Sequence, residues 1–190
     1  MRFHVLAAIA VLSACSRGDA RPVGTVDSVV PRDTALARFR EGLNRPAGLT
    51  GGAESLEGLV ARLVTAVERS DTAGLAGLML TRAEFAYLYY PTIPEGRPPY
   101  DLSPGLFWFM LEGSSQRGRS ALLSDRGGQP LGYAGVRCDG PPRHYAENTV
   151  WPLCLVRRVQ ATGDTVEARL FGPIVERGGR FKLVTLANKL

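Results

Sequence analysis

The spacing of apolar residues changes once along the chain, from a helical repeat before Gly127 to an alternating repeat after it. Between residues 56 and 67, apolar side chains recur every three or four positions, which places them on one face of a helix. Between residues 165 and 171 they alternate with charged residues, which is typical of a half-buried strand. Helices followed by antiparallel strands predict an α+β domain, with the helices packed on a curved antiparallel sheet of about four strands.

Capping signals set the expected helix boundaries. Ser70-Asp71 predicts the start of a short helix, and Thr81 followed by Glu84 has the spacing of a capping box before an aromatic run. Ser103-Pro104 predicts another helix start, with a second helical piece from about residue 115 to 126. Strands are expected over residues 131–138, 149–160, 165–171, 174–175 and 181–187, with a break at Gly172-Pro173.

The first fifteen residues have the layout of an export signal. A basic start at Met1-Arg2 precedes a short apolar stretch and then the small residues Ser13 and Ala14. The order Leu12-Ser13-Ala14-Cys15 resembles the lipobox of bacterial lipoproteins. The resemblance implies cleavage after residue 14 and acylation of Cys15, with several acyl chains that hold the protein stably at a membrane.

A transmembrane helix and an ordinary cleaved signal fit this segment less well. A transmembrane helix needs about 20 apolar residues, and the stretch is too short. An ordinary cleaved signal also favours small residues before the cut, but it does not account for a cysteine directly after them. The lipoprotein interpretation places the domain in the periplasm or outside the cell, and leaves open whether the inner or the outer membrane holds it.

The expected organisation is a signal over residues 1–14, a lipidated Cys15 with a flexible tether over 15–52, and one α+β domain over 53–190. The tether is poor in apolar residues, although residues 33–43 have the pattern of a short helix.

The remaining cysteines, Cys138 and Cys154, form an even pair in an oxidising compartment and predict a disulfide. Two buried free thiols, or a cysteine nucleophile, are the alternatives that spacing alone leaves open.

The formal net charge is +5, but the arginines are spread along the chain without a run of five or more basic residues. Nucleic-acid binding would require a clustered basic face, so no nucleic-acid partner is expected. The expected contacts are a membrane through the lipid anchor, and an envelope protein or a small apolar ligand.

Sequence patterns for catalysis are sparse. His144 is the only histidine after the signal, so no metal site is expected, and no cofactor-binding motif is present. The acidic candidates for a general base are Glu112, Asp125, Asp139 and Glu147. Both Asp125 and Asp139 adjoin glycine turns, where aspartate commonly bonds the local backbone.

Aromatic side chains are the stronger candidates for a ligand pocket or an interaction surface. They flank the proline-rich segment 91–104 or lie in the first strands, and for each of them a position in the core is the alternative. These candidates are Tyr87, Tyr90, Tyr100, Trp108, Tyr133 and Trp151.

The order of elements over residues 54–190 resembles the nuclear transport factor two-like, or ketosteroid isomerase-like, superfamily. That resemblance implies a cystatin-like cone with an apolar pocket between helices and sheet, and it is compatible with enzymes and binding modules alike. The favoured hypothesis is a non-enzymatic envelope lipoprotein that binds a partner protein or a small apolar ligand. The alternatives are an isomerase or dehydratase that uses a buried carboxylate and a tyrosine, or a purely structural envelope component.

Overall fold

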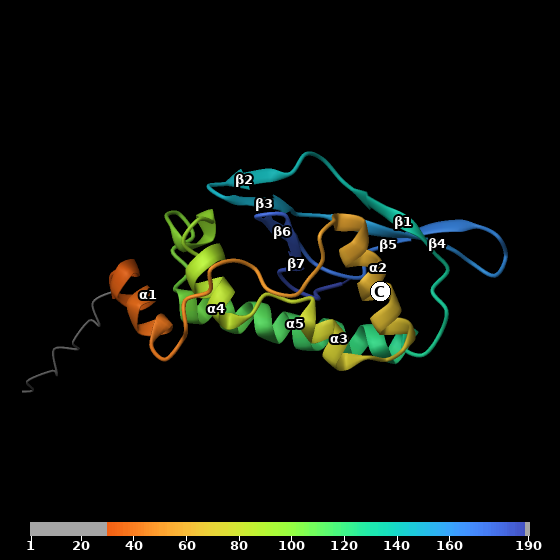
Figure 1. Ribbon diagram of the computed structural model, residues 1–190, viewed down its shortest axis with the longest axis horizontal. Helices are drawn as coiled ribbons and strands as arrows, with labels where there is room; N and C mark the ends of the chain where they lie inside the picture. The colour runs from red at the N-terminus through yellow and green to blue at the C-terminus, as the bar shows by residue number, and fades with distance from the viewer. Residues whose placement is uncertain (1–29, 189–190) are drawn as a thin grey trace, which may run out of the picture.

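The computed structural model of this protein describes residues 30–188 (Figure 1). Its α-helices are α1 (Arg32–Arg40), α2 (Leu56–Glu68), α3 (Thr72–Gly77), α4 (Arg82–Glu84) and α5 (Pro104–Arg126). A π-helix, η1 (Phe85–Tyr89), and a 3-10 helix, η2 (Pro94–Gly96), lie between α4 and α5. The strands are β1 (Tyr133–Cys138), β2 (Arg143–Tyr145), β3 (Asn148–Trp151), β4 (Cys154–Val159), β5 (Thr165–Ala168), β6 (Ile174–Arg177) and β7 (Arg180–Leu183). The domain is therefore α+β, as predicted.

The strands form two antiparallel sheets, ordered β1-β4-β5 and β2-β3-β6-β7, where one sheet of about four strands was expected. The chain still makes four antiparallel passes, over residues 133–145, 148–159, 165–177 and 180–183. Each of the first three passes is interrupted near a proline: Pro141-Pro142, Pro152 and Pro173. Because proline has no backbone N–H for the ladder, each pass divides into two strands that belong to different sheets. The predicted break at Gly172-Pro173 is confirmed.

Side-chain caps begin several helices, and those at Asp71 and Thr81 lie where the sequence predicts them, whereas no cap was predicted at Ser55. Ser55 accepts a hydrogen bond from the Gly58 N–H at the start of α2, and Asp71 accepts one from the Gly74 N–H at the start of α3. Thr81 and Glu84 form the predicted capping box at α4. Each cap satisfies backbone donors that the first turn of a helix leaves unpaired.

Helix α5 corrects one expectation. Ser103 caps it and Pro104 begins it, but it continues unbroken for 23 residues where two pieces were expected. Its glycines weaken helix propensity, yet Gly118 is buried against the C-terminal part of the chain. Tertiary packing therefore outweighs the local cost of these glycines.

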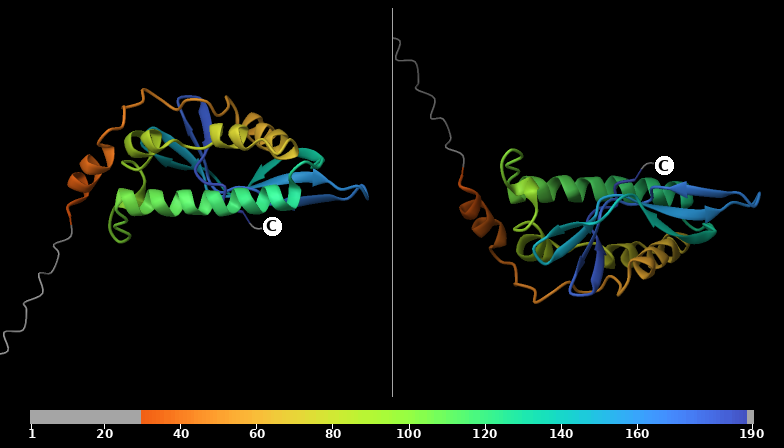
Figure 2. Two further views of the ribbon diagram at one scale, coloured as in Figure 1. Left: turned by 90° about the horizontal axis from the view of Figure 1, so that it is seen from below. Right: turned by 90° about the horizontal axis from the view of Figure 1, so that it is seen from above.

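Helices α2 and α5 lie on the same side of the strands, and one core fills the space between them (Figures 1 and 2). The buried face of α2, including Leu59, Leu63 and Val67, packs there with Phe171 and Ile174 from the strands. The hairpin of β4 and β5 extends past the end of α5 that lies away from α1 (Figure 2). The long axis of the molecule thus has α1 at one end and this hairpin at the other.

The expected tether, residues 15–52, is corrected for its described part. Residues 32–40 form α1, and both Leu36 and Phe39 are buried in a second core cluster with Phe85. Leu49 is also buried, and the Ala53 N–H donates to the Phe181 carbonyl. Three apolar side chains, Leu36, Phe39 and Leu49, are enough to attach this polar segment to the domain, because each one fits a site that other elements provide. Cys15 and the lipobox lie outside the described residues.

A disulfide joins Cys138 and Cys154, as predicted, across a directly paired position of β1 and β4. Cys154 is buried in the core and Cys138 packs against it. A bridge that closes a loop of this length stabilises a domain by about 3 kcal/mol in the chain-entropy model. The geometry of this pair favours the disulfide over the free-thiol and nucleophile alternatives.

Candidate binding groove beside helix α5

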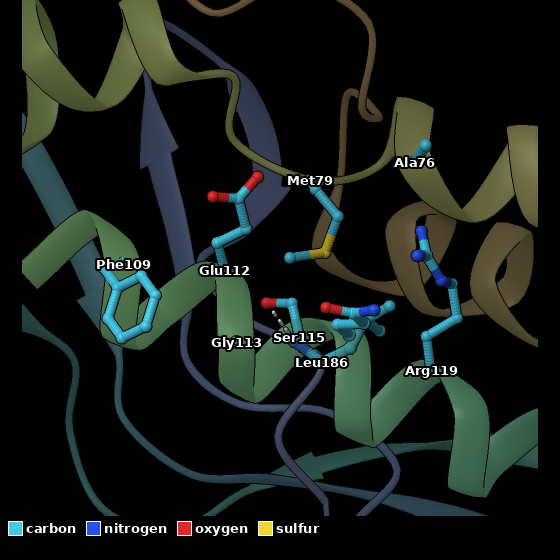
Figure 3. A pocket seen from close by; sticks show the side chains of 9 residues that line it. Ala76, Met79, Phe109, Glu112, Gly113, Ser115, Arg119 and Leu186 are labelled. Carbon is cyan, nitrogen blue, oxygen red and sulfur yellow. Dashed lines mark hydrogen bonds between the residues drawn. The ribbon is translucent and has the colours of Figure 1, made fainter.

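A groove runs between the middle of α5 and residues 76–80, which include the end of α3 and the residues just after it (Figure 3). It consists of two adjoining cavities of about 290 Å³ and about 160 Å³. Residues shared by both cavities are Ala76, Met79, Glu112, Ser115 and Arg119. Apolar side chains that line one or the other are Leu80, Trp108, Phe109, Leu111, Val184 and Leu186.

Residues 184–186 form the floor of the groove and are bonded to α5. The Leu186 N–H donates to the Ser115 hydroxyl, which itself donates to the Leu111 carbonyl. The Asn188 side-chain amide donates to the Gly118 carbonyl over 2.8 Å. A side chain at Gly118 would collide with the Leu186 backbone, because a Cβ there would lie 2.0 Å from its carbonyl oxygen. Glycine at this position allows the close approach that makes the floor.

The opposite wall is attached to the same part of the chain. The Leu80 N–H donates to the Leu183 carbonyl, and the Leu183 N–H donates to the Leu78 carbonyl. Met79 thus lies in a short parallel bridge along the edge of β7. Because both walls are bonded to residues 183–188, the width of the groove is determined by rigid backbone contacts.

Two opposite charges border this apolar floor. Glu112 and Arg119 lie seven residues apart on α5, which is about 10 Å along a helix axis. Figure 3 shows both side chains extending from α5 toward the facing segment, with Met79 and Ser115 between them. Among residues 30–188, neither side chain takes part in an ion pair or a side-chain hydrogen bond. The groove therefore offers a carboxylate, an apolar strip and a guanidinium in sequence.

Of the six aromatic candidates, only Trp108 lines the groove. Its ring centroid is 5.2 Å from that of Phe85, so it connects the groove to the second core cluster. Tyr100 is 62% exposed and lies in the loop before α5, away from the groove lining.

Tyr87 and Tyr90 attach α1 and the proline-rich loop to the domain. The guanidinium of Arg40 lies 4.5 Å from the Tyr87 ring centroid, a cation–π contact. Tyr90 is fully buried, and its hydroxyl donates to the Leu102 carbonyl over 2.7 Å. Tyr90 therefore belongs to the packed interior, whereas Tyr87 is half-buried against it.

Tyr133 and Trp151 lie on strands β1 and β3. The Tyr133 hydroxyl is buried without a hydrogen-bond partner in the described structure, and burial raises its pKa. Trp151 packs on Phe181, with ring centroids 5.5 Å apart. The six aromatics are thus distributed over several packing sites.

The acidic candidates are also dispersed. Glu112 lines the groove, whereas Asp139 pairs with Arg137 and Glu147 pairs with Arg177. Asp125 is exposed near the end of α5. His144 lies exposed on β2, with its Nδ1 atom 3.3 Å from the Thr149 hydroxyl.

The most buried carboxylate lies elsewhere. Glu84 accepts hydrogen bonds from Lys182 Nζ, the Thr81 N–H and the Thr50 N–H. Burial favours its neutral form, but these donors outweigh burial and hold the pKa of Glu84 below its ordinary value. Its oxygens are fully used by the protein, so Glu84 has a structural role.

The groove residues Met79, Ser115, Arg119 and Leu186 were not among the sequence-predicted site residues. A weak signal existed in α5, where Glu112, Ser115 and Arg119 recur at helical spacing and share one face. The facing segment and the floor are far away in the sequence, so no local pattern connects them to α5.

No group of three or more potential metal ligands is found among residues 30–188. No helix in this range is long and apolar enough to cross a membrane. Comparison of the chain with protein-family models, with curated proteins and with solved structures finds no match.

Proposed function

We propose that this protein is a membrane-anchored bacterial envelope lipoprotein whose domain binds a small zwitterionic amphipathic ligand in the α5 groove. The anchor rests on the resemblance of residues 12–15 to a lipobox. The binding role rests on one observation: Glu112 and Arg119, both without a protein partner in the described residues, lie on either side of Met79 and Ser115 in the groove.

The chemistry of the groove defines the ligand class. The guanidinium of Arg119 suits a carboxylate, which it can hold through two parallel hydrogen bonds. Glu112 suits an ammonium or a hydroxyl of the ligand, about 10 Å along α5 from the group that Arg119 holds. Met79 and Leu186 offer apolar contact to the part between them. An extended segment of an envelope protein, with charged side chains at this spacing, is the alternative occupant.

The cystatin-like cone of the nuclear transport factor two-like superfamily is part of this proposal. Four antiparallel passes with helices on one side support it.

An isomerase or dehydratase is the less favoured alternative. It requires a carboxylate shielded from water beside a tyrosine, because such shielding raises the pKa of a general base to a useful value. Glu84 is shielded but already bonded to Lys182, whereas Glu112 is exposed. A purely structural role does not account for the two charges beside the groove.

Titration calorimetry with three probes tests the binding role. We expect 8-aminooctanoate to bind and both octanoate and octylamine to bind more weakly, because each lacks one charge. Arg119→Gln should weaken 8-aminooctanoate binding about tenfold, since a charge-assisted hydrogen bond contributes about 1.5 kcal/mol. Arg117→Gln is the matched control, because Arg117 is exposed on α5 but does not line the groove. Equal binding of all three probes would refute recognition by the charge pair.

A separate experiment tests the anchor. Cys15→Ser should prevent acylation and processing, so metabolic labelling with a palmitate analogue should be lost together with the shift to the mature mass. Unchanged labelling in Cys15→Ser would show that the lipid is attached elsewhere or that the lipobox is not used.

A further inference from the structure

Large apolar side chains are concentrated on the outside of the molecule at one end. The exposed large apolar residues among residues 30–188 are Val30, Tyr100, Leu106, Phe109, Met110 and Val159. All except Val159 belong to α5 or to segments at its start. Tyr100, Leu106, Phe109 and Met110 are hereafter called the α5 tip. Phe109 is the most exposed of them, at 72%.

The three members of the α5 tip that belong to the helix occupy one of its faces. Leu106, Phe109 and Met110 have the spacing i, i+3 and i+4, so their side chains form one apolar stripe. The same face continues with Arg117, Ala121 and Ser124, which are exposed and polar or small. The apolar stripe is therefore confined to the first two turns, and no described segment covers it.

The chain enters the domain beside this tip. Val30, the first described residue, lines a cavity with Phe39 of α1 and with Ser103, Pro104 and Gly105. Gly105 is the neighbour of Leu106, so the segment from Cys15 reaches the domain next to the apolar stripe. Both views of Figure 2 show α1 and the start of α5 at the same end of the molecule.

This entry point limits how far the tip can be from a lipid on Cys15. The chain between Cys15 and Val30 spans at most about 50 Å when fully extended. The α5 tip therefore stays close to the bilayer that holds the lipid, within the reach of this segment. Such confinement raises the effective concentration of the membrane at the tip and favours even a weak contact.

We propose that the α5 tip inserts into the headgroup and acyl boundary of the bilayer that holds the lipid on Cys15. This inference rests on the proposed function, since it requires the anchor. A short apolar stripe with an exposed phenylalanine and a tyrosine has the composition of membrane-interface contacts, which enter the bilayer by about 5–10 Å.

Charges around the tip are mixed. Arg38 is exposed and lines the Val30 cavity, and Arg97 is exposed on the loop before α5, so both can meet lipid phosphates. Asp33 and Asp101 are exposed near them and oppose strong attraction to anionic lipids. The apolar stripe therefore carries the contact, and its dependence on anionic lipid should be modest.

Lipid photo-labelling tests this contact. The purified full chain is reconstituted into vesicles of phosphatidylethanolamine and phosphatidylglycerol that contain a trace of phospholipid with a diazirine in its acyl chain. After flotation and irradiation, labelled peptides are mapped by mass spectrometry. We expect label on residues 100–110 and none on residues 117–126, although both ranges have exposed side chains.

The double variant Leu106→Glu/Met110→Glu should reduce labelling of residues 100–110 on the order of tenfold or more, because each lost apolar insertion weakens partitioning by about that factor. Ala121→Glu/Ser124→Glu is the matched control, with the same added charge on the same helix face farther along. Thermal unfolding should be unchanged in both, and Phe109→Ser replaces the first variant if it unfolds.

The outcomes separate the two proposals. A chain that floats with the vesicles but carries no label on residues 100–110 overturns the membrane contact and leaves the anchor intact. Cross-linking of the tip to a second copy of the chain, without lipid label on it, also overturns the membrane contact and leaves the anchor intact. A chain that does not float overturns the anchor, and the tip contact falls with it. Label on residues 100–110 that persists in the glutamate variant also overturns the contact, since it shows mere proximity.

Discussion

The Nζ atom of Lys182 lies 2.8 Å from the Oε2 atom of Glu84, and these side chains are 2% and 1% exposed. Glu84 also caps the start of α4 and accepts from the backbone of Thr50, so it joins three parts of the chain. The pair connects residues 98 positions apart, and its polar atoms are satisfied within the protein. A buried pair of this kind fixes how α4 sits on β7.

Removing one partner of the pair should destabilise the domain strongly. Lys182→Met leaves the Glu84 charge buried without its main donor, so we expect the free energy of unfolding to fall by about 3–5 kcal/mol. Arg180→Met is the control, because Arg180 pairs with Glu54 at the surface and its loss should cost about 1 kcal/mol or less. Urea denaturation measures both. The double variant Glu84→Gln/Lys182→Met should lose less than the sum of the single changes, and strict additivity would contradict direct coupling.

The same carboxylate should make the domain sensitive to acid. The folded pKa of Glu84 is lowered, so the unfolded chain takes up its proton first as the pH falls. The stabilisation by Glu84 is therefore fully present above its unfolded value of about 4.5 and is lost as the pH falls through the folded value. We expect the urea midpoint of the wild type to fall more steeply below about pH 4.5 than that of Glu84→Gln. Equal slopes would contradict this assignment.

A second titrating carboxylate needs a control. A hydrogen bond from Arg137 lowers the pKa of Glu167, so this residue also contributes to acid sensitivity. Its pair with Arg137 lies at the surface, where salt screens it. Repeating the measurement with Glu167→Gln at high salt should therefore leave the difference that Glu84 causes.

Helix α1 is the clearest departure from what the sequence predicts. Val23, Val26 and Leu36 are sparse within a polar segment, which favours a tether when it is considered alone. Phe39 is buried only because Phe85 and Arg82 offer it a site, with a ring-to-ring distance of 5.8 Å and a guanidinium at 4.6 Å. Those partners lie more than 40 positions away, so local composition carries no sign of them.

Truncation of Phe39 tests whether α1 belongs to the domain. Phe39→Ala should reduce the free energy of unfolding by about 3 kcal/mol, because it removes a buried ring and leaves a cavity. Thr34→Ala on the exposed side of α1 should have almost no effect and serves as the control. Guanidinium unfolding followed by tryptophan fluorescence gives both values. If Phe39→Ala and the wild type have the same unfolding midpoint, α1 does not contribute to the stability of the domain.

Local signals were sufficient for most of the elements. The caps at Asp71, Thr81 and Ser103 predict helix starts because the bonds they make lie within four residues. The Cys138–Cys154 disulfide was predictable from compartment and parity. The division into two sheets was not, since it depends on how each proline break is paired across neighbouring passes.

The groove could not be predicted from local sequence either, because it also depends on contacts between segments that are distant in the chain. Glu112, Ser115 and Arg119 share a face of α5, but that pattern also describes an ordinary solvated helix. Their place in a groove depends on Met79, which pairs with Leu183 of β7, and on Leu186, which follows β7 in the chain. The aromatic residues were predicted to line a pocket or an interaction surface. Most of them instead pack between elements, because large rings bury much apolar area.

Gly118 allows a decisive test of how the groove is built. Gly118→Ala introduces a Cβ atom that would lie 2.0 Å from the Leu186 carbonyl oxygen, so helix α5 and residues 184–188 must separate. Such overpacking costs about 1–3 kcal/mol, and it outweighs the gain in helix propensity that alanine normally brings.

Gly113→Ala in the same helix is the matched control, because its nearest neighbour is the flexible end of Arg117 at 3.4 Å. That control should stabilise the domain by about 0.5–1 kcal/mol, which is the usual advantage of alanine over glycine inside a helix. Opposite shifts in the unfolding midpoint are therefore expected from the same chemical change five residues apart. If both variants are stabilised, the C-terminal segment does not pack on Gly118, and the floor of the groove is not held by α5.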